Sequence, residues 1–185
     1  GLKPVYWCWE CETALADAEV EYQDKESPSI YVGFRVKDGK GKLQPGVDIV
    51  IWTTTPWTLP GNQAVALRPD SVYVVADTDR GKVLVAKELL ERALSDMGLG
   101  LRGIVAEHRG GDLEWVVCEH PFLRRDSIVI TGEHVSLDQG TGCVHTAPGH
   151  GEEDFVAGLP YGLKPLTPVD ERGVFTEDAG PFKGQ

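Results

Sequence analysis

Residues 30 to 36 read Ile-Tyr-Val-Gly-Phe-Arg-Val, and apolar side chains occupy every second position of this stretch. Such alternation is typical of a β-strand with one buried face. A turn rich in lysine and glycine follows at residues 37–42, and a second apolar stretch follows at residues 47–52. The simplest prediction from this part of the sequence is a β-hairpin arm.

Further short, β-rich stretches extend along the chain on the C-terminal side of this arm. They lie between Gly, Pro and Asp residues, which break regular structure. The stretches are residues 64–67, 72–76, 82–86, 114–118, 128–131 and 142–146. So many strands in one chain predict a mainly β protein built as a barrel or a sandwich.

Helical patterns are few. Residues 87–97 carry Leu90, Leu94 and Met97 at helical spacing, and Gly98 is placed to end a helix there. A second, short helix is expected to open at Gly151. No internal repeat, low-complexity segment or long linker divides the chain, so we expect one domain.

Composition narrows the class of protein. The 185 residues are 41% hydrophobic and 25% charged, and no apolar run approaches the roughly 20 residues that span a bilayer. We therefore expect no membrane partner. The net charge of -11 argues against broad contact with a phosphate backbone, because such contact depends on clustered Lys and Arg. A nucleic-acid partner would be held elsewhere or only at its tip.

The chain begins with Gly rather than Met, and its last residues carry no helix cap or strand closure. We therefore expect a fragment cut from a longer protein. The four cysteines are too sparse for a secreted disulfide scaffold, which favours a reducing, cytoplasmic location. Cys8 and Cys11 form a C-x-x-C knuckle, which is half of a four-ligand zinc site.

A threonine-rich loop follows the second strand of the predicted hairpin. Residues 52–62 read Trp-Thr-Thr-Thr-Pro-Trp-Thr-Leu-Pro-Gly-Asn, and two prolines and a glycine stiffen them. Hydroxyl and amide groups both donate and accept hydrogen bonds, so they suit an ester, a ribose or a water. Composition alone leaves a plainer interpretation open, because threonine is common in strands.

Residues 140–155 read Gly-Thr-Gly-Cys-Val-His-Thr-Ala-Pro-Gly-His-Gly-Glu-Glu-Asp-Phe and place histidines and acids behind a glycine-rich strand. The acids at residues 152–154 would fall in the first turn of a helix, where they interact with free backbone N–H groups. Capping is thus the plain interpretation. A metal site is disfavoured because His145 and His150 straddle a Pro-Gly break and match no helical metal motif.

The threonine loop, the glycine-rich segment and the opening residues 2–8 (Leu-Lys-Pro-Val-Tyr-Trp-Cys) together resemble the editing insertion of isoleucyl-tRNA synthetases, class I aminoacyl-tRNA synthetases. The resemblance runs nearly end to end. Valyl and leucyl relatives carry Thr-Thr-Arg-Pro in place of residues 53–56 and lack a histidine equivalent to His145. The implied fold is a closed β-barrel core with small α/β insertions. Residues 1–185 would be a single editing domain, with an α/β insertion at 77–120.

The resemblance also implies an activity, which is hydrolysis of valyl-tRNA(Ile), and of valyl-adenylate, by a positioned water. Thr53, Thr54, Thr55 and Asp154 would be catalytic, with Asp154 holding the α-ammonium group of valine. The residues expected to bind substrate are Trp57, Thr58, Asn62, His145, Thr146 and His150. Packing of Trp57, helix capping by Asp154 and a core role for His145 stay open beside these roles.

The expected partners are the 3′ end of aminoacylated tRNA(Ile), its valine moiety and the remaining domains of a parent isoleucine-tRNA ligase. Editing itself would need no cofactor. Zinc is expected only in the parent, bound by Cys8 and Cys11 with a second pair outside this chain. The alternative functions are a zinc-knuckle binding module and a non-catalytic insertion that orients tRNA.

Overall fold

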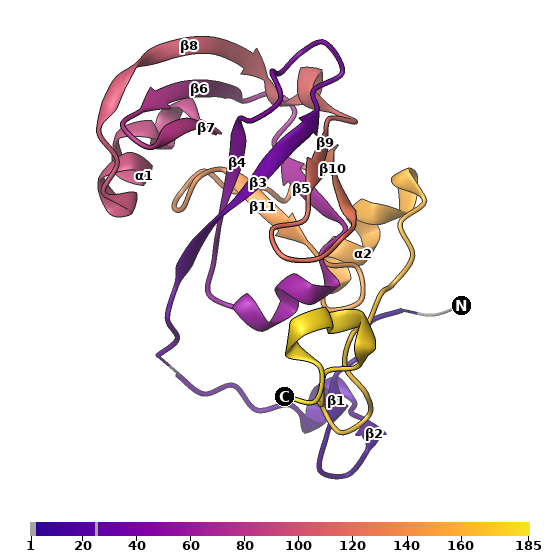
Figure 1. Ribbon diagram of the computed structural model, residues 1–185. Coiled ribbons are helices and arrows are strands. Elements are labelled where there is room, and N and C mark those ends of the chain that lie inside the picture. Colours follow the sequence, from indigo (N-terminus) through magenta and orange to yellow (C-terminus); the bar gives the residue numbers. More distant parts are fainter. Residues whose placement is uncertain (1–2, 25) are drawn as a thin grey trace.

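The computed structural model describes residues 3–24 and 26–185 (Figure 1). Gly1, Leu2 and Lys25 lie outside the described residues, and Leu2 is the first residue of the opening stretch quoted above. One mixed sheet contains nine strands in the order β11-β5-β10-β9-β3-β4-β7-β6-β8. They are β3 (Ile30–Asp38), β4 (Asp48–Thr53), β5 (Ala64–Leu67), β6 (Val72–Thr78), β7 (Gly81–Ala86), β8 (Leu101–Arg109), β9 (Val117–Glu119), β10 (Asp126–Thr131) and β11 (Cys143–Thr146).

The predicted hairpin arm is confirmed. β3 and β4 pair antiparallel, with Ile30 opposite Thr53. The loop between them passes so close to itself that a Cβ on Gly39 would lie 1.8 Å from the carbonyl oxygen of Leu43. Glycine is therefore required at the tip, and β3 runs two residues further than the alternating stretch before the turn begins.

The sheet curls so that its inner face packs on itself. Alternate side chains of β3 and β4 enter one buried cluster together with inward-facing residues of most other strands. Its largest fully buried members are Tyr73, Phe34, Ile49, Ile51, Leu67, Leu84, Leu113, Val36, Val47 and Val65. Burial of this apolar surface is the main contribution that holds the curved sheet together.

The expectation of a closed barrel is wrong. Within residues 3–24 and 26–185 the ladder ends at β11 on one edge and at β8 on the other. The β11 edge approaches β7, where the N–H of Ala86 donates to the carbonyl of Thr141 at 2.8 Å. The β8 edge instead arches outward together with β6 (Figure 1). Two register shifts in the pairing of β6 with β8 bend this edge away from β11. Bulges of this kind bend a strand, so the two edges never meet.

The predicted helix at residues 87–97 is present as a 3-10 turn, η3 (Lys87–Leu89), followed by α1 (Leu90–Met97). Gly98 ends the helix with a φ of 64°, a left-handed conformation that glycine adopts readily. Apolar residues of α1, including Ala93 and Leu94, pack on the outer face of β4, β6 and β7. This part of the sheet is therefore buried on both faces.

The strand β8 was not predicted from the sequence. It is an edge strand whose residues are mostly exposed, so its side chains show no alternation between apolar and polar. β9 begins at Val117, later than the predicted start at residue 114, because Trp115 has a φ of 69° that interrupts the strand. The assignment of residues 77–120 to an insertion stays a prediction, although β7, β8 and β9 are strands of the main sheet.

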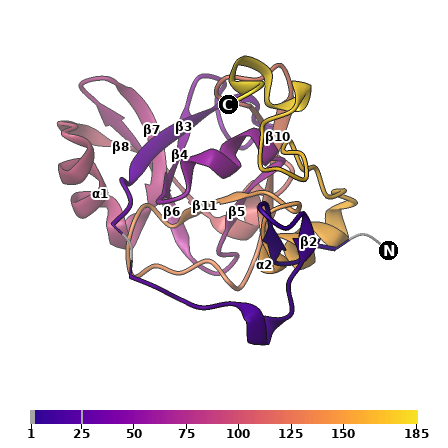
Figure 2. The ribbon, with the colours of Figure 1, turned by 90° about the horizontal axis from the view of Figure 1, so that it is seen from below.

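The second predicted helix is α2 (Glu152–Gly158), with Gly151 at its N-cap position. Seen from below, α2 and the small hairpin of β1 (Trp7–Cys8) and β2 (Thr13–Ala14) lie on the side opposite α1 (Figure 2). The hairpin contacts the C-terminal part of the chain, since the indole N–H of Trp7 donates to the carbonyl of Glu171 at 2.7 Å. In the described ranges, no helix has the length and apolar character needed to cross a membrane.

Candidate active site

Hydrogen bonds of its own hydroxyl groups fix the conformation of the threonine loop. It leaves β4 at Thr53 and continues into the 3-10 helix η2 (Pro56–Gly61). The hydroxyl oxygen of Thr53, which is buried, accepts the N–H of Thr55 at 3.0 Å, and the hydroxyl of Thr58 donates to the carbonyl of Thr55 at 2.9 Å. These local bonds satisfy backbone groups that a loop would otherwise leave to water. The loop is therefore a fixed element of the fold.

A second loop supports this element from outside. The ring of His120 donates from Nε2 to the carbonyl of Leu59 at 2.9 Å, and Arg125 donates to the carbonyl of Pro60. His120 also accepts backbone N–H groups at Nδ1, so its ring stays neutral. Burial lowers the pKa of His120 to about 4, in agreement with this arrangement.

The glycine-rich segment crosses from β11 into α2 through a tight turn. β11 pairs antiparallel with β5, and the N–H of His150 donates to the carbonyl of Ala147 at 2.8 Å to close the turn. Gly149 lies against the chain near Leu166, where a Cβ would stand 2.2 Å from the carbonyl oxygen. This close approach explains why a glycine occupies the middle of the turn.

Asp154 lies in the first turn of α2, but it does not cap that helix. Its Oδ2 accepts the backbone N–H of Ala147 at 2.8 Å and so ties α2 to the end of β11. Within the described residues, no protein group donates a hydrogen bond to its Oδ1. Burial raises the pKa of Asp154, and the bond from Ala147 opposes that shift only in part.

Six of the predicted site residues line one cavity of about 220 Å³. They are Thr53, Thr55, Thr58, His145, His150 and Asp154. Trp52 and Val144 complete its wall, and sequence analysis missed both although each directly precedes a predicted residue. The cavity thus joins two segments that are about 90 residues apart in the chain.

A second cavity of about 300 Å³ adjoins the first, and the two share Trp52, Thr53, Val144 and Asp154. It contains the predicted residue Thr54. The two hollows therefore adjoin at these four shared residues, an arrangement that gives a ligand with two parts room on both sides of Asp154 and Thr53.

Three predicted residues do not line these cavities. Trp57 is 53% exposed on the outside of η2. Asn62 and Thr146 are fully buried, so neither reaches the cavity surface. Thr146 faces its own strand, and Asn62 lies behind the ring of His145.

His145 is held on both sides of its ring. The distance from its Nδ1 to Nδ2 of Asn62 is 2.9 Å, and the distance from its Nε2 to the hydroxyl of Thr58 is 2.8 Å. Burial, with smaller contributions from His150 and His120, lowers the pKa of His145 to about 3. The ring is neutral at physiological pH and forms a rigid wall of the cavity.

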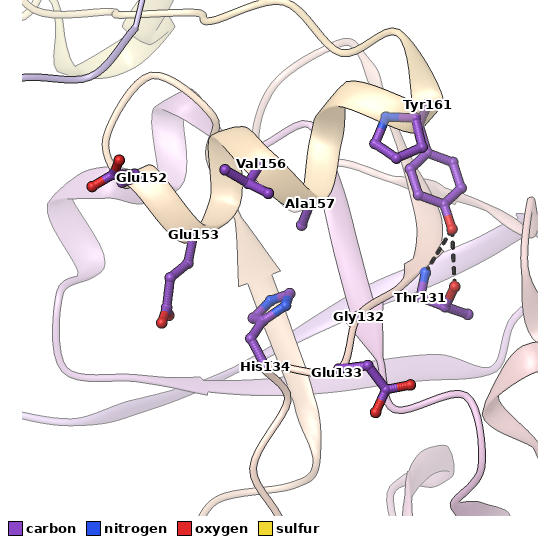
Figure 3. A pocket seen from close by; sticks show the side chains of 10 residues that line it. Thr131, Gly132, Glu133, His134, Glu152, Glu153, Val156, Ala157 and Tyr161 are labelled. Carbon is purple, nitrogen blue, oxygen red and sulfur yellow. Dashed lines mark hydrogen bonds between the residues drawn. The ribbon is translucent and has the colours of Figure 1, made fainter.

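A hollow larger than either of these cavities, about 620 Å³, lies elsewhere. It runs along α2 between Thr131, His134 and Tyr161, and it contains none of the predicted site residues (Figure 3). Tyr161 accepts the N–H of Thr131 at 3.0 Å and donates to Glu114, which fixes the wall of this hollow. Size alone therefore does not mark the site, and the smaller cavities carry the convergent polar groups.

The cysteine knuckle lies on the β1–β2 hairpin, away from both cavities. Cys8 accepts the backbone N–H of Cys11 at 3.4 Å, and this bond lowers the pKa of the Cys8 thiol. In the part of the chain that the structure describes, no group of three or more His, Cys, Asp or Glu side chains is placed to hold a metal. Because structural zinc takes four ligands, two thiols fit half of such a site.

Comparison with known proteins identifies the family. The model for tRNA synthetases class I (I, L, M and V) matches residues 1–159. This chain belongs to the class I tRNA synthetases. The isoleucine-tRNA ligase of Desulforamulus reducens is 60% identical over 186 residues, and those of Natranaerobius thermophilus and Bacillus subtilis are 56% and 53% identical. Each alignment covers 100% of this chain but only 20% of the synthetase it matches.

Solved structures show the same fold in related synthetases. The crystal structure of GlLeuRS-CP1 matches with a TM-score of 0.61 at 17% identity, over 81% of this chain and 75% of that one. The P. knowlesi cytosolic leucyl-tRNA synthetase editing domain matches with a TM-score of 0.58 at 12% identity, over 69% and 60%. The predicted resemblance to the isoleucyl-tRNA synthetase editing insertion is therefore confirmed.

Proposed function

We propose that this domain edits for an isoleucine-tRNA ligase by hydrolysing valyl-tRNA(Ile), and also valyl-adenylate. Its partners would be the 3′ end of the aminoacylated tRNA and the other domains of the synthetase. The isoleucine-tRNA ligases that it resembles over its whole length support this parent, and the leucyl-tRNA synthetase editing domain supports the role through the shared fold.

The need for such a site follows from the limits of binding. When two side chains differ by one methylene, an apolar pocket binds the larger one more tightly by only about 1–3 kcal/mol. Isoleucyl-tRNA synthetase is the standard illustration of this limit. A second site that hydrolyses the smaller product overcomes this limit. Such a site must admit valine and exclude isoleucine.

One observation carries the proposal, namely that Asp154 lines both cavities while no described protein group donates to its Oδ1. A carboxylate placed there would hold the α-ammonium group of the aminoacyl ester through a charge-assisted hydrogen bond. The valine side chain would enter the 220 Å³ cavity toward His145, and the adenosine would occupy the adjoining cavity. Asp154 thus orients the ester between the two.

The hydroxyl groups of the threonine loop would position the water. Thr53 and Thr55 line the cavity beside Asp154, and their Oγ atoms are 3.3 Å apart. A water that forms hydrogen bonds to both hydroxyl groups would face the carbonyl carbon of the ester. Orientation of reactants and fixed dipoles supply much of a rate enhancement for an activated ester, so no nucleophilic side chain is needed.

The experiment is a deacylation assay of this chain with valyl-tRNA(Ile) and with isoleucyl-tRNA(Ile). We expect release of valine with multiple turnovers and sparing of isoleucyl-tRNA. A matched control is Glu152→Gln. It removes an acid from the same helical turn, and Glu152 lines neither cavity of the site. Binding of the tRNA end without turnover would instead indicate an insertion that only orients tRNA.

A further inference from the structure

Three side chains form a row at the wall of the small cavity, and two of them line it. Asn62, His145 and Thr58 lie in this order, joined by the 2.9 Å and 2.8 Å contacts of the two ring nitrogens. Asn62 is fully buried and His145 is 8% exposed, so water does not compete for the contact between them. The row links two residues of one short loop to a strand residue more than 80 positions away.

The orientation of the Asn62 amide is fixed independently of the histidine. Its Nδ2 donates to the carbonyl oxygen of Ala64 at 2.8 Å. A flipped amide would place Oδ1 against that carbonyl, and two acceptors repel each other. The NH₂ group must therefore face both Ala64 and His145. Because an NH₂ group can only donate, Nδ1 of His145 must be the acceptor and carry no proton.

The contact on the opposite side of the ring indicates the same tautomer of His145. The hydroxyl of Thr58 has one proton, and it donates that proton to the carbonyl of Thr55 at 2.9 Å. Its oxygen is then an acceptor toward His145, so Nε2 of the ring carries the proton and donates it. Two unrelated carbonyl groups thus select a single tautomer.

The charged groups around the ring do not favour a second proton. His150 from the turn after β11 and His120 from the loop after β9 are the charged groups that act on the ring, and both lower the pKa of His145. Asp154 of α2 lines the same cavity, but it is not among the causes of the shift in the His145 pKa. Burial, the largest cause of the lowered pKa, acts in the same direction.

We propose that Asn62 is a positioning residue, which acts by holding His145 as its neutral Nε2–H tautomer instead of contacting the substrate. With both nitrogens occupied by protein partners, His145 is a wall of fixed shape and takes no part in proton transfer. This assigns to Asn62 a role different from the substrate contact expected from the sequence.

The selectivity of the site depends on this row, a consequence that rests on the proposed function. A ring that rotated or gained a proton would change both the width and the charge of the cavity that receives the amino-acid side chain. Loss of the Asn62 amide should then weaken the preference for valyl-tRNA over isoleucyl-tRNA, even though Asn62 touches neither.

The direct test is nuclear magnetic resonance of the ¹⁵N-labelled chain. Long-range ¹H–¹⁵N spectra distinguish the two neutral tautomers of histidine and its charged form, and the signals missing from His145→Gln assign the ring. We expect a neutral Nε2–H ring whose signals do not change between pH 8 and pH 5. A ring protonated at Nδ1, or one that titrates in this range, would overturn the proposal.

Variants separate positioning from simple support. Asn62→Asp replaces the donor by an acceptor of the same shape, so Nδ1 should become protonated and the ring should titrate. Thr58→Ser keeps the acceptor at Nε2 and should preserve the tautomer. An Asn62→Asp ring that stays neutral and protonated at Nε2 would refute the role of Asn62. If that variant does not fold, the spectrum of the parent chain decides.

The deacylation assay adds an independent readout. The ratio of kcat/KM for valyl-tRNA to that for isoleucyl-tRNA should fall by about tenfold or more in Asn62→Asp, the size of discrimination that one methylene provides. An unchanged ratio would contradict the link to selectivity. If the parent chain hydrolyses neither ester, the proposed function is wrong. The spectra still decide which tautomer His145 adopts.

Discussion

The carboxylate of Asp154 accepts the backbone N–H of Ala147 at 2.8 Å, which joins the first turn of α2 to the residue that follows β11. One oxygen of this side chain therefore has a structural role, whereas no described protein group donates to the other, and Asp154 lines both cavities. The two roles are separable by mutation, because an amide oxygen can still accept the N–H while an amide cannot pair with an ammonium group.

We expect Asp154→Asn to abolish deacylation of valyl-tRNA with little loss of stability. Asp154→Ala should abolish deacylation and also lower the free energy of unfolding by about 1.5–3 kcal/mol, the range for a hydrogen bond to a charged group. Urea unfolding and the deacylation assay measure the two effects. Full activity in Asp154→Asn would exclude the ammonium role.

The threonine loop should respond unequally to substitution. Thr54 and Thr55 are exposed, so their change to valine should reduce kcat/KM for valyl-tRNA mildly, since neighbouring hydroxyls can replace each other. Thr53→Val should be more severe because its hydroxyl also accepts the N–H of Thr55. A triple variant that keeps the activity of the parent would show that these residues serve only the loop.

Truncating the cavity wall should relax selectivity. His145→Ala removes a ring that is 8% exposed and leaves space where, on the proposed function, the side chain of isoleucine is excluded. Exclusion by overpacking a rigid site costs about 1–3 kcal/mol, so hydrolysis of isoleucyl-tRNA should rise by about 5- to 160-fold. Steady-state rates on both charged tRNAs provide the measurement. If isoleucyl-tRNA is still spared, His145 is a core residue and not a gate.

Acid should destabilise the fold through His120. Its pKa is about 4 in the folded state and about 6.5 when unfolded, so below pH 6.5 the unfolded chain binds the proton first. The stabilisation is complete above pH 6.5 and falls by at most about 1.4 kcal/mol per pH unit between pH 6.5 and 4.

Urea unfolding at pH 7 and pH 5 tests this dependence. His120→Gln should reduce the difference between the two free energies of unfolding. Equal pH dependence in the parent and in His120→Gln would show that the pKa of His120 is the same in the folded and the unfolded chain.

Metal analysis tests the cysteine knuckle. Since Cys8 and Cys11 offer two thiols and structural zinc takes four ligands, the purified chain should hold much less than one tightly bound zinc per molecule. Cys11→Ser should abolish the weak binding that remains. One zinc that survives dialysis against a mild chelator would show a complete site within this chain.

Some features follow from the sequence alone because their causes are local. Alternation at residues 30–36 predicted β3, the spacing of Leu90 and Leu94 with Gly98 behind them predicted α1, and Gly151 marked the start of α2. The two polar segments also identified the family, since their residue order can be read without a fold. Short-range sterics and periodic burial account for these successes.

Only the tertiary structure decided which side chains meet. Sequence analysis placed Asn62 at the substrate, but packing buries it behind His145, and Asp154 turned out to bind Ala147 instead of its own helix. The bulges that turn β8 away likewise left the sheet open where a closed barrel was expected. Contacts between distant segments depend on how the curved sheet brings β4, β5 and β11 together, and no local pattern in the chain encodes that geometry.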